Sequence, residues 1–209
     1  MPYLPAKREN PPSQAHARGG IAPLGEVGGC GGWGSVDGVT DRAAPPDAIV
    51  VMGVSGAGKS LIGAGLASRL GYAFVDADDL HPAENIAKMA AGIPLDDLDR
   101  WPWLDLVGAA IAHRAGGIVV ACSALKVAYR DRLRTAAPDA VFVELEGSPE
   151  LLATRIGARR DHFMPATLLA SQLATLEPLG PAERGARVDV DGSPADVVER
   201  AVTALAALP

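Results

Sequence analysis

The chain has 209 residues, of which 48% are apolar and 21% are charged, so it can bury the core of one ordinary globular domain. Its net charge is −6 and its Lys and Arg residues form no long run, which argues against nucleic acid as a partner. No apolar run approaches the roughly 18 residues that span a bilayer, and no secretory signal is visible. Cys30 and Cys122 have no histidines near them and indicate unpaired thiols, so we expect a cytoplasmic protein without membrane contact.

Residues 1–47 differ in composition from the rest of the chain. Proline is spread through them, and the stretch from Gly28 to Gly34 is nearly all glycine. Such a segment cannot bury enough apolar surface to offset the entropy lost on ordering. We expect a disordered Gly/Pro-rich leader, or a segment that results from a start codon assigned too far upstream. A partner-binding tail is the alternative, and no motif supports it.

Residues 48–209 alternate short apolar runs with amphipathic stretches, which is typical of an α/β fold with a parallel sheet. The apolar runs predict five strands, at 48–52, 73–75, 118–121, 140–145 and 187–190. The amphipathic stretches predict helices at 59–70, 82–91, about 102–115 after a polar turn, 127–136, 149–158, 165–176 and 195–207. Ser148 and Ser193, each followed by proline, are expected to cap two of these helices. The pattern predicts one three-layer domain.

A phosphate-binding motif follows the first predicted strand. The pattern G-x-x-x-x-G-K-[ST] is matched by Gly53, Val54, Ser55, Gly56, Ala57, Gly58, Lys59 and Ser60. The glycines let successive backbone N–H groups turn inward toward phosphate oxygens, and the next helix adds its positive N-terminus. Lys59 is expected to reach the β- and γ-phosphates, and the Ser60 hydroxyl to bind Mg²⁺. The motif predicts a site for ATP·Mg²⁺ but does not name the reaction.

Acidic residues after the second strand narrow the class of P-loop protein. No N-K-x-D or T-K-x-D element for guanine is present, and the third strand runs into Cys122-Ser123 instead of an Asp-Glu pair. Asp76, Asp78 and Asp79 come at the carboxyl end of the second strand, the edge where parallel α/β sheets bind ligands. These features favour a small-molecule kinase over a GTPase or a motor ATPase.

Three further blocks of sequence carry more specific patterns. The first contains D-A-D-D-L-H-P at 76–82 and D-R-W-P-W-L at 99–104, the second contains C-S-A-L-K at 122–126 and Y-R-D at 129–131, and the third contains H-F-M-P at 162–165, S-Q at 171–172 and T-L-E at 175–177. In this order and spacing they resemble the gluconokinase family, of the thermoresistant type. The resemblance covers essentially all of 48–209 and leaves the leader outside. It implies a three-layer P-loop NTPase, similar to nucleoside monophosphate kinases, with a five-stranded parallel sheet and a short lid.

The resemblance also implies a substrate. It indicates transfer of the γ-phosphoryl group of ATP to the terminal hydroxyl of D-gluconate, giving 6-phosphogluconate. A polyol carboxylate needs acceptors for its hydroxyls and a cation for its carboxylate. Asp78 and His81 are expected to serve the hydroxyls, while the candidate cations are Lys88, Arg100, Lys126 and Arg130. Arg100 is the strongest of them because we place it in a loop after an acidic run; Lys88 and Arg130 have the alternative of a solvated helix face or surface ion pairs.

The predicted mechanism relies on positioning and charge. We expect Ser60 and Asp76 to hold Mg²⁺, and Asp78 to accept the proton of the attacking hydroxyl, although Asp76 and Asp78 can exchange these roles. Lys59 and Arg159 would neutralise the transferred group, with Arg159 arriving on the lid, and Arg155 would cover the adenine. The alternatives are a kinase for another hydroxy acid such as shikimate, or a nucleotide-binding module without catalysis. A homodimer is implied by the resemblance alone.

Overall fold

The computed structural model describes residues 45–113, 115–158 and 166–209, all of which belong to one compact unit. The predicted leader lies almost entirely outside the described residues, so its boundary at residue 47 stays a prediction. Within the described part, no helix has both the length and the apolar character that crossing a membrane requires.

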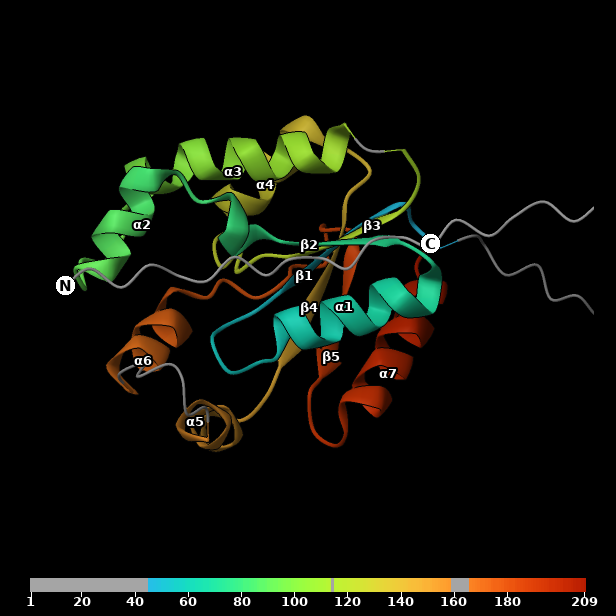
Figure 1. Ribbon diagram of the computed structural model, residues 1–209. Helices are drawn as coiled ribbons and strands as arrows, with labels where there is room; N and C mark the ends of the chain where they lie inside the picture. The colour runs from blue at the N-terminus through green and yellow to red at the C-terminus, as the bar shows by residue number, and fades with distance from the viewer. Residues whose placement is uncertain (1–44, 114, 159–165) are drawn as a thin grey trace, which may run out of the picture. The chain divides into compact units, whose positions relative to one another are not determined.

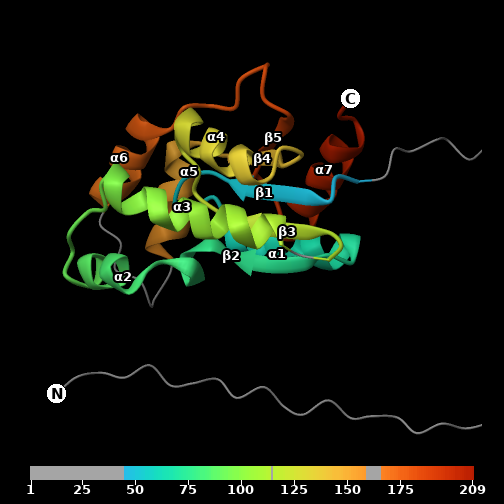
Figure 2. The same cartoon turned by 90° about the horizontal axis from the view of Figure 1, so that it is seen from above.

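Five parallel strands form one sheet, as the apolar runs predict (Figures 1 and 2). They are β1 (Ala48–Met52), β2 (Ala73–Asp76), β3 (Ile118–Ala121), β4 (Val141–Glu146) and β5 (Gly185–Asp189). Their order across the sheet is β2-β3-β1-β4-β5, and every neighbouring pair is parallel. Because β1 lies at the centre, the loop that follows it opens at the carboxyl edge of the sheet between β3 and β4.

Helices cover both faces of the sheet and complete the three layers (Figure 1). Helix α1 (Lys59–Leu70) and helix α7 (Pro194–Ala206) pack together on one face, while α3 (Asp97–Ala112) and α4 (Val127–Ala136) pack together on the other. The remaining helices are the 3₁₀ turn η1 (Ala77–Leu80), α2 (Ala83–Ala90), α5 (Pro149–Gly157) and α6 (Ala166–Thr175). Ser148 caps α5 and Ser193 caps α7 through their side chains, as the sequence indicates.

The central strand supplies a core to each face, since side chains alternate along a strand. Ile49 and Val51 are fully buried in the cluster that contains the residues of α1 and α7. Val50 and Met52 are fully buried in the opposite cluster, beneath α3 and α4. This two-sided burial explains why β1 is an uninterrupted apolar run, and it holds the start of the phosphate-binding loop in a rigid part of the molecule.

Helix α3 begins at Asp97, well before the position near residue 102 that the sequence indicated. Asp96 and Asp99 form a capping box, in which each side chain accepts a hydrogen bond from the other residue's backbone N–H. Pro102 lies inside the helix. The expectation that Arg100 lies in a loop was therefore wrong, because the residues taken for a polar turn end in the first turn of α3.

Candidate active site

The phosphate-binding loop joins β1 to α1 and depends on glycine at its turns. Gly53 has φ +137° and Gly56 has φ +84°, both in the region that L side chains rarely adopt. A Cβ at Gly53 would lie 2.8 Å from the carbonyl oxygen of Leu145, and one at Gly56 would lie 2.8 Å from that of Leu152. The loop therefore lies directly against β4 and α5, with no room for any larger residue at these two positions.

A cavity of about 590 Å³ lies over this loop. Its walls combine loop residues, acids that follow β2, and apolar side chains: Ser55, Gly56, Gly58, Lys59, Ser60, Asp76, Asp78, Met89, Ala121 and Ile156. The cavity stands at the carboxyl edge of a parallel sheet, where open α/β folds bind ligands. The structure thus brings Lys59, Ser60, Asp76 and Asp78 together, although they come from two separate strand ends.

The two aspartates are held in different ways. Asp76 ends β2, and its carboxylate accepts a hydrogen bond of 3.1 Å from the backbone N–H of Asp78, the second residue of η1. Loss of water around the Asp78 carboxyl raises its pKa, the neighbouring Asp76 charge raises it further, and Lys59 and His81 oppose the shift. Asp78 lines the cavity, and its raised pKa makes it a stronger base than an ordinary aspartate.

His81 is oriented by two neighbours. Its ring stacks on Trp103 with the ring centroids 4.3 Å apart, and the Trp103 indole N–H donates to the carbonyl of Ala77 at 2.7 Å. The Asn85 amide donates to the Asp99 carbonyl at 2.9 Å, and its nitrogen lies 3.3 Å from Nδ1 of His81. Because an amide –NH₂ can only donate, this contact leaves Nδ1 as the acceptor and the ring proton on Nε2. Burial lowers the pKa of His81, which favours this neutral form.

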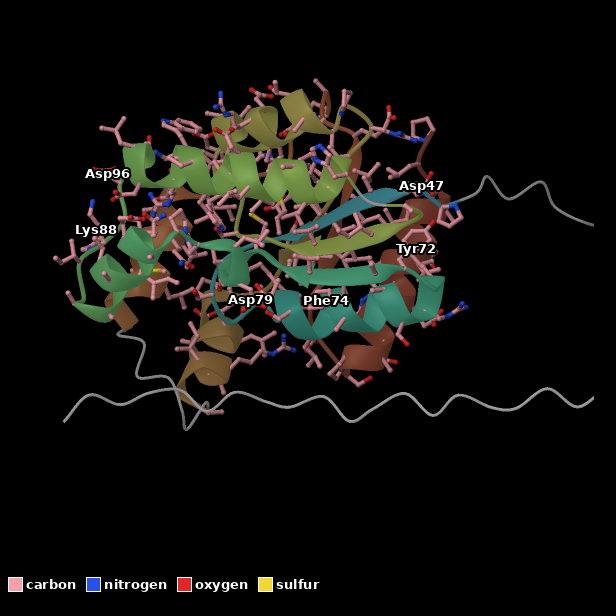
Figure 3. The ribbon with its side chains drawn as sticks, turned by 45° about the horizontal axis from the view of Figure 1, so that its top comes forward. Asp47, Tyr72, Phe74, Asp79, Lys88 and Asp96 are labelled. Atoms are coloured by element: carbon pink, nitrogen blue, oxygen red, sulfur yellow. The ribbon has the colours of Figure 1, made fainter. Side chains whose placement is uncertain are left out.

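Three of the predicted cations gather near the start of α3. Lys88 pairs with Asp99 at 2.6 Å, and Lys126 pairs with Asp97 at 2.8 Å. Side-chain hydrogen bonding is the leading cause that raises the pKa of both lysines and lowers the pKa of both aspartates. The Tyr129 hydroxyl also donates to Asp97. Figure 3 shows Lys88 and Asp96 at the end of the domain opposite Asp47 and Tyr72, with Asp79 between the two ends.

Arg100 makes the longest ion pair of the three cations. Its Nη1 lies 3.8 Å from Asp97 and 3.4 Å from the Tyr129 hydroxyl. A cation in the first turn of a helix receives no support from the helix dipole, so the capping of α3 does not explain its presence. Besides burial, the charges of Asp78 and Arg100 both act on the pKa of His81, Asp78 raising it and Arg100 lowering it.

Arg130 is not placed as the sequence predicted. Its side chain is fully buried and forms two bonds of 2.7 Å with the Glu183 carboxylate. The same guanidinium donates to the backbone carbonyls of Ala124, Leu125 and Glu177. It therefore fits neither the substrate-binding role nor the surface-pair alternative. It supports the segment after β3, where Ala124 has φ +42°, the single positive φ of a non-glycine residue in the described ranges.

Of the remaining predicted residues, Arg155 lies in α5. Arg155 donates from Nη2 to the carbonyl of Val190 at 2.7 Å, which ties α5 to the chain just beyond β5. The predicted lid residues Arg159, His162, Phe163 and Met164 lie outside the described residues, so their roles stay predictions.

The donor set fits Mg²⁺ held by a nucleotide better than a metal held by protein alone. In the described part of the chain, no three His, Cys, Asp or Glu side chains are grouped to hold a metal ion. Ser60 and Asp76 both line the cavity beside the phosphate-binding loop. Mg²⁺ commonly takes only one or two protein ligands and completes its shell with phosphate oxygens and water. The arrangement therefore suits a magnesium–nucleotide complex.

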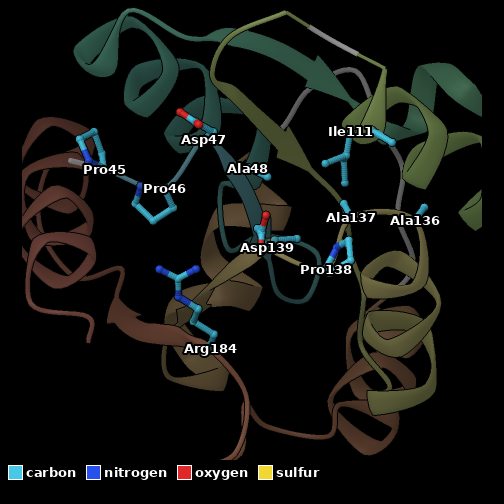
Figure 4. Close-up of a pocket in the computed structure, with 12 residues that line it drawn as sticks. Pro45, Pro46, Asp47, Ala48, Ile111, Ala136, Ala137, Pro138, Asp139 and Arg184 are labelled. Carbon is cyan, nitrogen blue, oxygen red and sulfur yellow. The ribbon is translucent and has the colours of Figure 1, made fainter. Parts of the chain in front are cut away.

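A second cavity, of about 540 Å³, lies at the opposite edge of the sheet. It is lined from the start of β1, the end of α3, the turn before β4 and the residue before β5, including Pro45, Asp47, Ile111, Asp139 and Arg184 (Figure 4). Ligands of open parallel sheets bind at the carboxyl ends of the strands, and this is the amino-terminal edge. It contains none of the loop residues or acids described above.

Sequence reasoning missed the partners that orient the predicted residues. Asn85, Asp97, Asp99 and Tyr129 were not predicted as site residues, although each contacts one that was. The spacing of His81 and Asn85, four residues apart, is a signal that could have linked those two. Gln172 belongs to the third block of the resemblance, but no spacing links it to Ser55, whose N–H donates to its amide oxygen at 2.6 Å.

The parallel order of strands, the glycine-dependent loop and the Lys59–Ser60 pair define a P-loop kinase fold. Comparison with known proteins agrees, since a family model described as an AAA domain matches residues 49–179. Gluconokinase from Gluconobacter oxydans (strain 621H) is 46% identical over 166 residues, covering 78% of this chain and 93% of that protein. The probable gluconokinase of Xenopus tropicalis is 48% identical over 161 residues, covering 68% of this chain and 85% of that protein.

A solved structure gives the same result. The crystal structure of a gluconokinase from Sinorhizobium meliloti 1021 is 51% identical and aligns with a TM-score of 0.72, covering 77% of this chain and 92% of that chain. The chain belongs to the gluconokinase family. The resemblance seen in the sequence and the fold that it implied are thereby confirmed.

Proposed function

We propose that this protein transfers the γ-phosphoryl group of ATP to the terminal hydroxyl of D-gluconate, giving 6-phospho-D-gluconate. One observation carries the proposal: Lys59 and Ser60 of the G-x-x-x-x-G-K-[ST] loop line one cavity with Asp78, while the charges of Asp78 and of the cation Arg100 both act on His81. An acceptor that spans these groups needs a hydroxyl at one end and an anion at the other. Gluconate has this form, and the relatives described above are named gluconokinases.

Asp78 is the proposed acceptor of the attacking hydroxyl's proton. It lines the cavity with Lys59, and its raised pKa gives it a greater affinity for a proton than an ordinary aspartate has. The Asp76 carboxylate accepts the backbone N–H of Asp78, so it supports the position of the proposed base. This difference favours Asp78 over Asp76 as the residue nearest the hydroxyl.

Arg100, Lys126 and Lys88 are the proposed anchors of the substrate carboxylate and adjoining hydroxyls. Arg100 has the weakest internal pairing, so it loses least when it turns toward a new carboxylate. Lys126 and Lys88 are held by Asp97 and Asp99 and present fixed donors. Neutral His81, with its proton on Nε2, can donate to a substrate hydroxyl between the two ends.

Ser60 and Asp76 would hold Mg²⁺, which would neutralise charge on the β- and γ-phosphates. Lys59 would bind the same phosphates. Arg159, which is not among the described residues, would add a second positive charge. Arg155, fixed on Val190, would cover the adenine. We further propose that the enzyme works in the cytoplasm, where its buried Cys122 stays a free thiol.

The test is ADP formation by the full-length protein with ATP and Mg²⁺, in the presence of gluconate, shikimate or no acceptor. We expect gluconate-dependent ADP formation in the wild type and none in Lys59→Ala. A preference for shikimate would contradict the substrate assignment but leave the kinase assignment intact. Equal ADP formation with and without every acceptor would contradict transfer to a small molecule altogether.

A further inference from the structure

Gln172 of α6 contacts the phosphate-binding loop at Ser55, which lies 117 residues earlier in the sequence. Its side-chain oxygen accepts a hydrogen bond from the Ser55 N–H over 2.6 Å, which is at the short end for an N–H···O bond. Ser55 lines the cavity together with Lys59 and Asp78. No role assigned above to any residue requires this contact.

The acceptor on that N–H has the same chemical character as a phosphate oxygen. Backbone N–H groups of such a loop bind phosphates by donating to their oxygens. A carbonyl oxygen and a phosphate oxygen cannot both take the full hydrogen bond of one N–H group. The Gln172 amide therefore stands as an internal competitor for one donor of the phosphate cradle.

Helix α6 is held in place by its own contacts, so the Gln172 side chain can leave Ser55 without movement of the whole helix. Leu169, one turn before Gln172, is buried in the core cluster that contains Val54 and Leu152. Beyond the helix, the backbone N–H of Glu177 donates to the Leu125 carbonyl at 2.8 Å, and the Glu177 carboxylate accepts from the Val127 N–H at 2.5 Å. With both ends held, Gln172 can leave Ser55 by rotating about its own side-chain bonds.

We propose that Gln172 is a positioning residue of the nucleotide site: its amide oxygen holds the Ser55 N–H and is exchanged for a phosphate oxygen when a nucleotide binds. The proposal rests on the proposed function for the nucleotide site alone and is independent of gluconate. In the wild type, part of the binding free energy of the nucleotide is offset by loss of the Gln172–Ser55 bond. Gln172 thereby sets nucleotide affinity without contacting the base or sugar.

Two substitutions separate exchange from simple support of the loop. Gln172→Ala removes the competitor, so the protein should bind a non-hydrolysable ATP analogue about 2- to 10-fold more tightly, given the net strength of one hydrogen bond. Gln172→Glu keeps the acceptor but adds a negative charge beside the phosphates, so binding should weaken by about tenfold or more near pH 8. Lowering the pH toward 5 brings the new carboxyl nearer to the ordinary glutamate pKa of about 4.3, so a growing fraction is protonated and the ratio of the Gln172→Glu to the wild-type dissociation constant should begin to fall.

The experiment is calorimetric titration of the full-length wild type and variants with the ATP analogue and Mg²⁺ between pH 5 and 8. Thr175→Ala is the matched control, because this exposed residue of the same helix bonds within the helix to the Ser171 carbonyl; it should match the wild type. Unchanged or weaker binding by Gln172→Ala, or a pH-independent ratio for Gln172→Glu, overturns the exchange. Gln172→Met serves if the alanine variant does not fold. Absence of binding by the wild type itself would overturn the proposed nucleotide site as well.

Discussion

The buried pair of Arg130 and Glu183 provides the sharpest test of how the structure is held together. A matched pair exists at Arg132 and Asp105, where the two bonds measure 2.6 and 2.8 Å, against 2.7 and 2.7 Å for Arg130 and Glu183. The two pairs share their two-bond geometry but differ in exposure. The side chains of Arg130 and Glu183 are 0% and 9% exposed, and those of Arg132 and Asp105 are 47% and 52% exposed.

Glu183→Gln leaves the Arg130 charge in a position that solvent does not reach. Breaking a buried pair by removing one partner costs about 3–5 kcal/mol, because the remaining charge is uncompensated. Glu183 also accepts from Arg134 and from the Gly180 N–H, both at 3.1 Å, so the substitution weakens more than one contact. Asp105→Asn should change stability little, since exposed pairs are solvated whether or not they form.

Urea unfolding followed by circular dichroism at pH 7 measures both variants against the wild type. Glu183→Gln should lower the free energy of unfolding by about 3–5 kcal/mol and Asp105→Asn should stay close to the wild type. The bond to Arg130 is the leading cause that lowers the pKa of Glu183 to about 2 from its ordinary 4.5. Its stabilising contribution is thus complete above about pH 4.5 and is lost as the pH falls toward 2. Equal losses in the two variants would refute the reasoning that burial decides the strength of these pairs.

Three further predictions concern the site. Asp78→Asn should lower kcat by about 10²- to 10⁴-fold with little change in ATP binding. The wild-type rate should fall with decreasing pH, starting at a pH above the pKa of an ordinary aspartate, because the raised pKa of Asp78 lets it take up a proton at a higher pH. A change confined to the KM for ATP would instead assign Asp78 to the nucleotide site. Arg100→Ala should raise the KM for gluconate about 10- to 100-fold without changing the KM for ATP, while Arg132→Ala changes neither; an unchanged KM for gluconate would remove Arg100 from the substrate site. Gly56→Ala should abolish ATP binding because its Cβ would lie 2.8 Å from the Leu152 carbonyl, whereas Gly92→Ala, with φ +73° but no atom within 4 Å, should retain it; binding by both variants would show that the loop can rearrange.

Local patterns predicted most of the fold. Strands β1 and β3 are uninterrupted apolar runs in which every residue is buried, and the signal for β1 is strong because both of its faces are buried. The phosphate-binding loop could be predicted because its turns need positive φ angles and close backbone contacts, which favour glycine. The start of α3 was misjudged because the residues before about 102 were taken for a polar turn, whereas the Asp96–Asp99 capping box begins the helix earlier.

Contacts between distant residues limited the prediction of the site. The sequence identified Arg130 as a cation but could not show that it forms a buried ion pair with Glu183, 53 residues further on. The same limit applied to Lys126 and Asp97, and to Gln172 and Ser55. Residue type and spacing therefore identified the charged and polar side chains that are candidates for the site. The tertiary structure decided which of the charged ones are already paired within the protein and which can bind a substrate.

The central claim is that Asp78 meets the terminal hydroxyl of gluconate while the cations near α3 hold its carboxylate. The measurement that tests it most directly is the proton-coupled ³¹P NMR spectrum of the product formed from ATP and gluconate. Phosphate on the terminal carbon couples to two equivalent or nearly equivalent protons, so the account predicts a triplet-like signal that grows together with ADP. A doublet, which marks phosphate on a secondary carbon, or the appearance of inorganic phosphate alone, would contradict it.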